Sequence, residues 1–309
     1  MSWTTTDLIT SIKLRAQVPT SQNTYSAPDM LALATEELFN TIVPLIMSVR
    51  ESYFQTLAQF SLEDDKARYR IPQRSIGMKL KDVQIENAAG DLRDLSRMEI
   101  ETKPYLTTDT GRIIEGFYFD GSVIVLVPTP KGVSSDFLNL HYFKRPGKLI
   151  ATSAAGLITN IDTVTKEVTI SSAPTTFTSN VLYDFVQSNP GFDSLAIDQT
   201  ATILGNILTF STLPTDLAVG DYVTLAGESP IPQIPAEFHS ILALRVAIVL
   251  LKGLGHRKEA EDLGEELSKL ELTSTALLSP RVEGEAKKLM ARNGVLNPGG
   301  LDNFLYRNS

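Results

Sequence analysis

Apolar side chains recur at helical spacing near the start of the chain. In residues 4–16, Leu8, Ile12 and Ala16 fall on one face behind a threonine-rich start, and threonine is a good helix N-cap. The pattern predicts a short helix with one buried face.

A longer helical pattern follows in residues 26–54. Ser26 and Pro28 are helix-start signals, and acidic residues precede an apolar stretch. Pro44 lies inside this pattern. Its ring removes one hydrogen bond and crowds the preceding turn, so we expect the helix to break or kink near Val43.

The densest apolar run of the chain lies in residues 241–251, after a proline-rich stretch. Pro235 suits the first turn of a helix, and Gly253 and Gly255 should end it. A membrane-spanning helix needs about 20 apolar residues. This run is shorter and Arg245 interrupts it, so we expect a buried core helix. The first residues also lack the features of a secretory signal, which favours an unexported protein without a membrane anchor.

Residues 256–278 read as an amphipathic helix. Leu263, Leu267, Leu270 and Leu272 form one stripe, with acidic residues elsewhere. We expect this helix to pack against the one before it.

Between the helical ends, residues 56–233 show a different period. Short stretches rich in Val, Ile, Tyr, Phe and Thr are bounded by Gly, Pro, Asn or Asp, which is typical of strands. The stretches are ARYRIP, KLKDVQIEN, IIEGFYF, SVIVLVP, FLNLHYF, KEVTISS, ILTFSTLP and DYVTLAG. Turn signals stand between them, in NAAGD and at the hairpin dipeptide Asp120-Gly121.

A weak internal repeat lies within this zone. VTISSAPTTF (168–177) and LTFSTLPTDL (208–217) align at an offset of 40, and DFV (184–186) and DYV (221–223) follow at an offset of 37. Two copies of strand, proline-containing turn and strand fit a small barrel or sandwich built by hairpin duplication. The alternative is that two hairpins share turn chemistry by chance.

These patterns predict an α+β fold. We expect residues 1–55 and 234–279 to form one helical bundle, with residues 56–233 inserted as an antiparallel β domain, a barrel or a sandwich. Residues 280–309 would form a C-terminal extension.

Composition narrows the function. The chain has 309 residues, of which 42% are hydrophobic, no cysteine, three histidines and a net charge of −8. Disulfides and thiolate metal sites are therefore excluded, and none of the histidines stands at metal-ligand spacing from another. The negative charge argues against a protein that grips DNA by its phosphates, but not against one that lets DNA slide past.

The sequence carries no recognisable catalytic motif. It lacks a nucleophile elbow, a phosphate-binding loop, a dinucleotide fingerprint and a zinc-protease motif. Acidic clusters at 63–65 and 259–266 could hide a glycosidase carboxylate pair, although solvated surface charge explains them as well. We therefore expect no enzyme activity, no cofactor and no bound metal.

The succession of segments nevertheless resembles a known family. It runs from SIKLRAQVPTSQNTYSAPDMLALATEELFNTIVPLIMSVRESYF through ARYRIPQRSIGMKLKDVQIEN, GSVIVLVPTP and LNLHYFKRPGKLI to GDYVTLAGESPIPQIPAEFHSILALRVAIVLLKGLG and LLSPRVEGEAKKLMARNG. Together these segments resemble the head-to-tail adaptor, or head completion, proteins of tailed bacteriophages. The resemblance implies a virion protein, assembled in the host cytoplasm, with a helical bundle formed by both chain ends. It also implies a ring, usually of twelve subunits, that docks under the portal protein, extends the DNA channel and receives further neck or tail proteins.

Two groups of residues are candidate sites under this interpretation. The C-terminal extension would fold onto the portal through basic residues and aromatic anchors, namely Arg281, Lys287, Lys288, Arg292, Phe304 and Tyr306. Acidic side chains would line the channel and keep DNA from sticking, namely Glu259, Glu261, Glu265 and Glu266. A solvated tail without specific function is the alternative for the first group.

The stretch RYRIPQRSIG is a third feature. Its alternating Tyr and Arg could contact nucleic acid, but the acidic composition favours ion pairs of Arg68, Arg70 and Arg74 with acids of the same or a neighbouring subunit. Two further functions stay open for the whole chain, a virion-associated glycan hydrolase and a carbohydrate- or receptor-binding β module.

Overall fold

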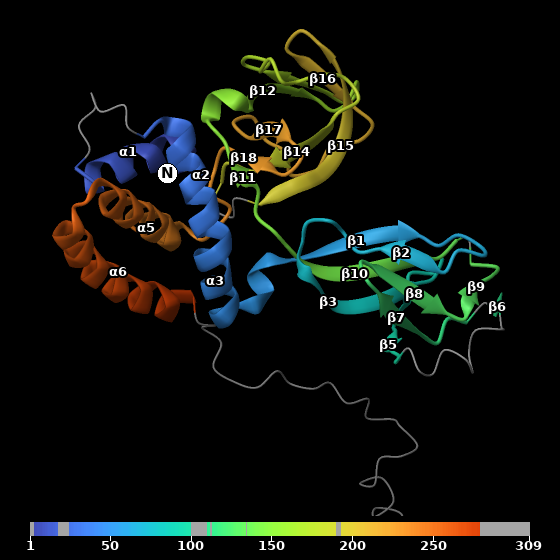
Figure 1. Cartoon of the computed structure of the whole chain (residues 1–309). Helices are drawn as coiled ribbons and strands as arrows, with labels where there is room; N and C mark the ends of the chain where they lie inside the picture. Colours follow the sequence, from blue (N-terminus) through green and yellow to red (C-terminus); the bar gives the residue numbers. More distant parts are fainter. Residues whose placement is uncertain are drawn as a thin grey trace, which may run out of the picture. The chain divides into compact units, whose positions relative to one another are not determined.

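The protein is a mixed α+β structure, as predicted (Figure 1). The computed structural model describes residues 3–17, 25–99, 110–111, 113–133, 135–189 and 193–278. Residues up to Leu278 form one compact unit.

The N-terminal helices begin at the capping signals found in the sequence. The elements are α1 (Thr5–Arg15), α2 (Ala27–Glu37), the π-helical turn η1 (Leu38–Ile42), α3 (Val43–Val49) and the 3₁₀ turn η2 (Glu51–Phe54). Thr4 caps α1 and Ser26 caps α2. In each case the carboxylate of the aspartate three residues later accepts a hydrogen bond from the backbone N–H of the capping residue.

Pro44 changes the helix in the predicted place but does not end it. Since proline cannot donate to the carbonyl one turn back, the backbone widens into the π turn η1 just before it, and the Val43 N–H donates to the Leu38 carbonyl. The helical path therefore continues over Ala27–Val49. At 23 residues it is long and apolar enough to cross a membrane by length and composition, whereas from the sequence we expected no segment longer than the apolar run at 241–251. Here 44% of its most apolar window is buried inside the protein, and core helices pass the same test.

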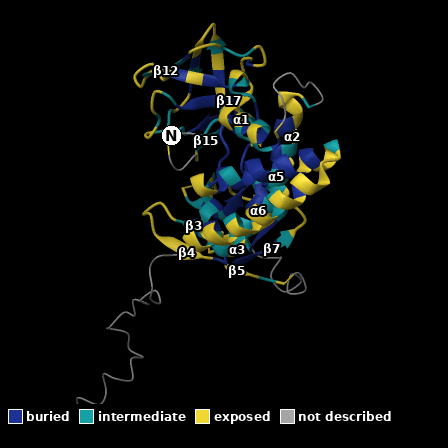
Figure 2. Cartoon of the chain, turned by 90° about the vertical axis from the view of Figure 1, so that its left-hand side faces the viewer, coloured by how far each residue is buried: buried dark blue, intermediate teal, exposed yellow. Residues whose placement is uncertain are grey.

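The C-terminal helices are α5 (Ala236–Leu254) and α6 (Arg257–Leu278). Pro235 is the N-cap of α5 rather than its first residue, and Gly255 ends the helix in a left-handed conformation with φ of 87°. Gly253 lies inside the helix. Figure 2 shows α5 almost wholly buried and α6 exposed along its outer side.

Helices from both chain ends contribute to one hydrophobic cluster. It joins side chains of α1, α2, η1 and α3 to side chains of α5, among them Leu8, Ile12, Met30, Leu38, Ile46, Phe238, Ile241 and Leu242. Each of these eight side chains is fully buried. Leu267 and Leu270 of α6 pack against this cluster, and together with Leu263 they pack against a smaller cluster that contains Ala16 and Leu244. Leu272, predicted to belong to the same stripe, is 74% exposed, because it lies on the opposite side of the helix.

The first part of the β zone is a sandwich of two four-stranded sheets. One sheet has the order β1-β10-β3-β4, with bounds Gln55–Ser61, Phe137–Lys144, Ser75–Glu86 and Leu92–Asp94. The other has the order β2-β8-β7-β5, with bounds Arg68–Arg70, Val123–Val127, Gly116–Asp120 and Ser96–Arg97. Their inner faces share a core that includes Tyr69, Val83, Ile124 and Leu140.

The second part is a closed six-stranded barrel with the order β12-β13-β16-β15-β14-β17. The bounds are Gly156–Asp162, Glu167–Ile170, Ile207–Phe210, Ser194–Leu204, Leu182–Val186 and Tyr222–Leu225. It has its own core around Tyr183, Phe185 and Phe210. The β zone thus contains both a sandwich and a barrel, where the sequence predicted one or the other.

The predicted repeat is confirmed as a structural repeat of the barrel. Exchanging β12 with β15, β13 with β16 and β14 with β17 leaves every strand neighbour unchanged. The registers agree as well. In β13–β16, Glu167 pairs with Thr209 and Thr169 with Ile207, which is the same pair at an offset of 40. In β14–β17, Phe185 pairs with Val223 and Val186 with Tyr222, the same pair at an offset of 37.

The β zone is not wholly antiparallel, which corrects a further expectation. Short parallel pairs join β5 to β7, β6 (Thr110–Gly111) to β9 (Thr129–Pro130), and β11 (Lys148–Leu149) to β18 (Glu228–Ser229). A 3₁₀ turn, η4 (Thr152–Ala154), leads into the barrel. Each of the eight predicted strand stretches contains an observed strand, and the expected hairpin joins β7 to β8 with Gly121 at φ of 62°.

Candidate functional site

A groove lies between strand β1 of the sandwich and the first half of strand β15 of the barrel. It encloses about 820 Å³. Residues 56–60 form one wall, and residues 194–199 form the other. Residues 70–74, which precede β3, also line it.

Among the strands that the structure describes, β1 pairs only with β10, so its other edge is free. Its sequence QTLAQFS has no charge and no proline, the two features that usually protect an edge from pairing. The Leu62 N–H, just after β1, donates to the carbonyl of Asp136, just before β10. Because hydrogen-bonded and non-bonded pairs alternate in antiparallel sheets, the backbone N–H and C=O of Leu57, Gln59 and Ser61 point away from β10, toward the free edge.

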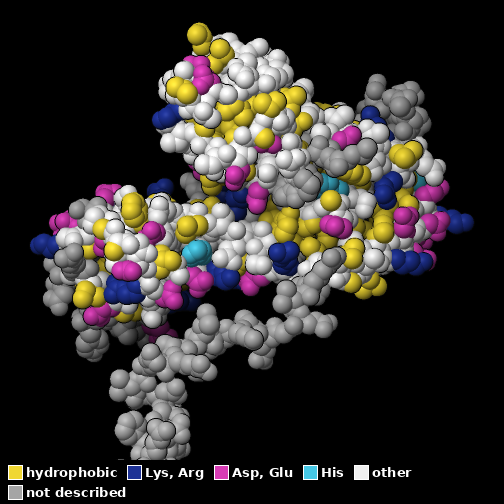
Figure 3. Space-filling model, turned by 180° about the vertical axis from the view of Figure 1, so that it is seen from behind, with side chains coloured by type: hydrophobic (Ala, Val, Ile, Leu, Met, Phe, Trp, Pro, Cys, Tyr) yellow, Lys and Arg dark blue, Asp and Glu magenta, His cyan; other side chains and the backbone are white. Residues whose placement is uncertain are grey.

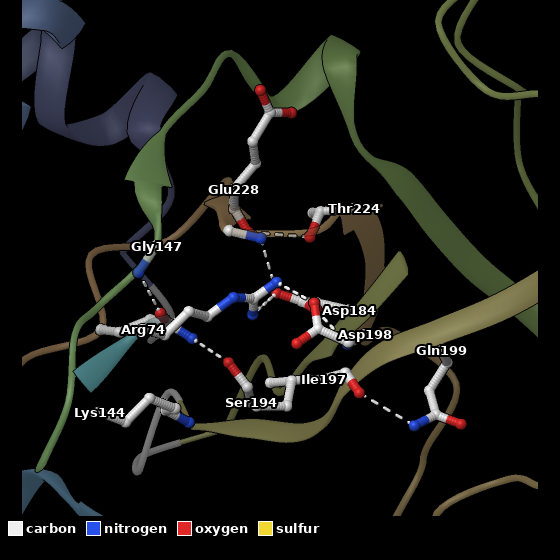
Figure 4. A network of polar contacts seen from close by, with 12 residues as sticks. Arg74, Lys144, Gly147, Asp184, Ser194, Ile197, Asp198, Gln199, Thr224 and Glu228 are labelled. Carbon is white, nitrogen blue, oxygen red and sulfur yellow. Dashed lines mark hydrogen bonds and ion pairs between the residues drawn. The ribbon is translucent and has the colours of Figure 1, made fainter. Parts of the chain in front are cut away.

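Arg74 binds two aspartates of the barrel (Figure 4). Its Nη1 donates to Asp184, and its Nη2 donates to Asp198 at 2.9 Å. The Asp184 side chain is only 3% exposed and that of Arg74 is 18% exposed, whereas that of Asp198 is 49% exposed. The pair with Asp184 is therefore a buried ion pair that ties the sandwich to the barrel.

The carboxylate of Asp184 is satisfied on both oxygens. Its Oδ1 accepts the Asp198 N–H at 3.0 Å and its Oδ2 accepts the Gly227 N–H at 3.0 Å. Asp198 itself adopts a left-handed conformation, with φ of 56°, where the register of β14 with β15 shifts. Such a bulge redirects a side chain, and here it turns Asp198 toward Arg74 (Figure 4).

Polar groups continue along the inner end of the groove. Lys144 approaches Asp193 at 3.3 Å, and Gln233 donates to the Ser194 hydroxyl at 2.9 Å. Burial raises the pKa of the Tyr142 phenol, which keeps it neutral and able to donate. These groups can bind a polar chain, and unpaired backbone groups beside them favour an extended polypeptide.

A polar row crosses the outer face of the same sheet. Gln59, Asn139, Gln84 and Asp94 are successive neighbours on β1, β10, β3 and β4. Gln84 donates to Asp94 at 2.7 Å. Asn139 is 3% exposed, and its Oδ1 is buried without a hydrogen-bond partner among the described residues. The sequence reading did not single out this row, because its members come from four separate strands.

The four predicted channel acids all lie exposed on α6. Successive helix residues are about 100° apart at 3.6 residues per turn. Since Leu263, Leu267 and Leu270 mark the inner side of α6, the side chains of Glu261 and Glu265 lie on its outer side. Glu259 and Glu266 lie together on one flank. On the face seen in Figure 3, acidic side chains are interspersed with Lys and Arg.

The predicted portal contacts cannot be placed in the same way. Arg281, Lys287, Lys288, Arg292, Phe304 and Tyr306 lie outside the described residues. The predicted ion pairs of the RYRIPQR stretch are confirmed for two arginines, since Arg68 binds Asp120 at 2.7 Å and Arg74 binds Asp184. Arg70 forms no ion pair with any residue that the structure describes.

Within the described ranges, no group of three or more His, Asp or Glu side chains is arranged to hold a metal ion. The fold and the groove together define a mixed α+β protein with a closed barrel and an unprotected strand edge. No protein-family model matches the sequence, and no curated protein matches it significantly.

Proposed function

We propose that this protein is a structural ring component of a tailed-phage virion, a head-to-tail adaptor. It docks under the portal protein, extends the DNA channel and provides the platform for further neck or tail proteins. The proposal rests on the order of sequence segments described above. It requires binding surfaces and no chemistry.

One structural observation carries the proposal furthest. Helices before and after the β zone share a single hydrophobic cluster, in which Leu8 and Ile12 of α1 meet Phe238 and Ile241 of α5. In the proposed arrangement these helices are one bundle formed by both chain ends, and the sandwich and barrel are carried on it. In the proposed ring, this bundle holds the sandwich and the barrel at fixed positions.

The proposed ring also assigns roles to charged surfaces. Acidic residues of α6, foremost Glu261 and Glu265, face the channel and repel DNA, so that DNA passes without sequence-specific binding. Residues 280–309 bind the portal through the basic and aromatic side chains named above. The ring has twelve copies on the portal and is a part of the virion neck.

Native mass spectrometry tests this function. The full-length chain is measured alone and mixed with intact rings of the portal encoded beside it. We expect a complex with one copy of this chain per portal subunit. A chain that ignores an intact portal ring contradicts the proposal and directs attention to glycan hydrolysis or glycan binding by the β parts.

Deletion of residues 280–309 tests the portal contact separately. We expect the truncated chain to keep its melting temperature, because these residues lie outside the compact unit that ends at Leu278, and to lose portal binding. As a matched control, Arg257→Ala and Lys258→Ala remove two exposed basic residues of α6 and should leave binding intact. Full binding by the truncated chain would contradict the assignment.

A further inference from the structure

The sheet β1-β10-β3-β4 ends in two unpaired edges. The β1 edge presents the backbone groups of Leu57, Gln59 and Ser61 to the groove. On the opposite edge, the Leu95 N–H donates to the Val83 carbonyl and the Asn87 N–H to the Asp91 carbonyl. By alternation, the backbone groups of Leu92 and Asp94 in β4 therefore point outward. No described strand pairs with either outer edge.

The two edges are complementary in direction. All three pairings in this sheet are antiparallel, so its four strands alternate, and the edge strands β1 and β4 run in opposite directions. A second copy in the same orientation therefore places its β4 antiparallel to β1 of the first copy. The contact joins two different surfaces, and such head-to-tail contacts generate rings when the rotation closes.

The two edges are also complementary in their faces. Gln59 and Asp94 are the end members of the polar row that runs through Asn139 and Gln84, so their side chains lie on the same face of the sheet. With Asp94 of one copy beside Gln59 of the next, the row continues and the hydrogen-bonding alternation is preserved.

Charge points the same way. Strand β1 carries no charge, and Arg70 at the groove has no ion pair among the described residues. The β4 edge is flanked by Asp91 and Asp94, neither of which forms an ion pair within the described part of the chain. Because β1 carries no charge, a β4 strand beside it places no like charges opposite one another.

We propose that β4 of a second copy of this chain pairs antiparallel with β1, in the groove beside β15, and that this sheet continuation joins adjacent subunits. The inference deepens the proposed ring and rests on it only for the supply of identical neighbours. The competing occupant of the groove, an extended segment of a different protein, is an outcome of the test.

Cysteine pairing tests the contact directly, because the chain contains no cysteine. Gln59→Cys and Asp94→Cys are made singly and together in the full-length chain. Within one copy these positions are three strands apart, about 14 Å at a strand spacing near 4.8 Å. A disulfide needs Cα atoms about 4.4–6.8 Å apart, so only separate copies can be linked.

Four oxidation experiments give distinct results. We expect a 1:1 mixture of the two single variants to give linked dimers, and the double variant to give a ladder of linked oligomers. The combination of Gln59→Cys with Leu92→Cys detects the same strand pairing if its register is shifted by two residues. Dimers from Gln59→Cys alone would indicate β1 pairing with β1 across a two-fold axis and would overturn the proposal.

A second variant does not depend on disulfides. Leu57→Lys places a charge on the β1 edge, where Leu57 is 48% exposed, and should weaken association of the chain about tenfold or more, or about 1.4 kcal/mol. Val164→Lys, at an 88% exposed apolar position of the barrel, is the matched control and should not change association. Both variants should melt as the original chain does.

The outcomes separate this inference from the proposed function. Native mass spectrometry follows each sample alone and with portal rings. If rings form on the portal but neither the 59/94 nor the 59/92 cysteine pair is linked, the β1–β4 contact is wrong and the adaptor function is still supported. Linked ladders from a chain that never binds the portal support the contact and contradict the adaptor function. A chain that is monomeric in both conditions contradicts both.

Discussion

Replacing Arg74 should destabilise the fold far more than replacing a neighbouring arginine. Arg74→Ala removes the cation from the Asp184 carboxylate, which is 3% exposed. Breaking a buried ion pair by removing one partner typically costs about 3–5 kcal/mol, because the remaining charge is buried without compensation. Two backbone N–H groups still bind Asp184, so we expect a loss near the lower limit, about 3 kcal/mol.

Arg68 provides the matched control. It lies six residues earlier in the same stretch and binds Asp120, but both side chains are exposed, at 61% and 46%. Exposed pairs contribute about 0–1 kcal/mol, so Arg68→Ala should be nearly neutral. Arg74→Lys should also lose stability, because a single ammonium does not reproduce the fork that reaches Asp184 and Asp198 at once.

The assay is urea unfolding followed by circular dichroism, with a double-mutant cycle between Arg74→Ala and Asp184→Asn. The two changes should cost less together than the sum of their separate effects, because removing the carboxylate charge relieves the loss of the cation. Each kcal/mol corresponds to a shift in Tm of about 2–4 °C for a domain of this order of size. If Arg74→Ala costs no more than Arg68→Ala, the ion pair does not tie the barrel to the sandwich in the way described.

Three further predictions concern single positions. Gly116→Ala should lower the free energy of unfolding by about 1–3 kcal/mol, because the added Cβ would lie 2.5 Å from the Ser96 carbonyl oxygen. In α6, the Cβ added by Gly264→Ala meets nothing within 4 Å, so this variant should be neutral or stabilising. Thermal unfolding of both variants measures the difference. Burial lowers the pKa of His239 in the folded protein, so its contribution to stability is present above the unfolded pKa of 6.5 and is lost as pH falls through the folded value. Below pH 6.5 the free energy of unfolding should therefore decline faster in the original chain than in His239→Asn. Parallel curves for the two chains would contradict this. Under the proposed function, Glu261→Lys with Glu265→Lys should slow DNA ejection from particles more than Glu259→Lys with Glu266→Lys, and unchanged ejection kinetics in both would contradict a channel-facing α6.

The sequence predicted elements whose signal is local. Strands such as β8 and β13 were found because short stretches rich in Val, Ile or Thr lie between clear turn residues. Helices α1 and α2 were found because a threonine-rich start and the signals Ser26 and Pro28 precede apolar residues at helical spacing. Strand β1 was missed, since QTLAQFS is largely polar and has one β-branched residue. Strand β15 was missed because a bulge at Asp198 interrupts its alternation.

Features set by long-range pairing could not be predicted. Whether short strands close into a barrel or stack as a sandwich depends on which strands are neighbours, and this chain uses both solutions. The groove is equally non-local, because its walls are 137 residues apart in sequence at Leu57 and Ser194. Arg74 was singled out as a partner for an acid, but its partner Asp184 lies 110 residues away and no local pattern identifies it.

The barrel repeat distinguishes contacts that both copies need for folding from the contact that the sandwich adds. Asp184 and Asp221 are equivalent in the two copies, both are almost fully buried, and both accept backbone N–H groups on their two oxygens. This shared role is structural, since it holds the backbone of each copy in place. Of these two aspartates, Asp184 also binds an arginine from the sandwich, and among the described residues Asp221 binds none. The same arginine reaches Asp198 on β15 of the second copy, which forms the groove wall. The Arg74 contact is therefore an addition to a symmetric barrel, and it holds the β15 wall beside the β1 edge with which an added strand would pair.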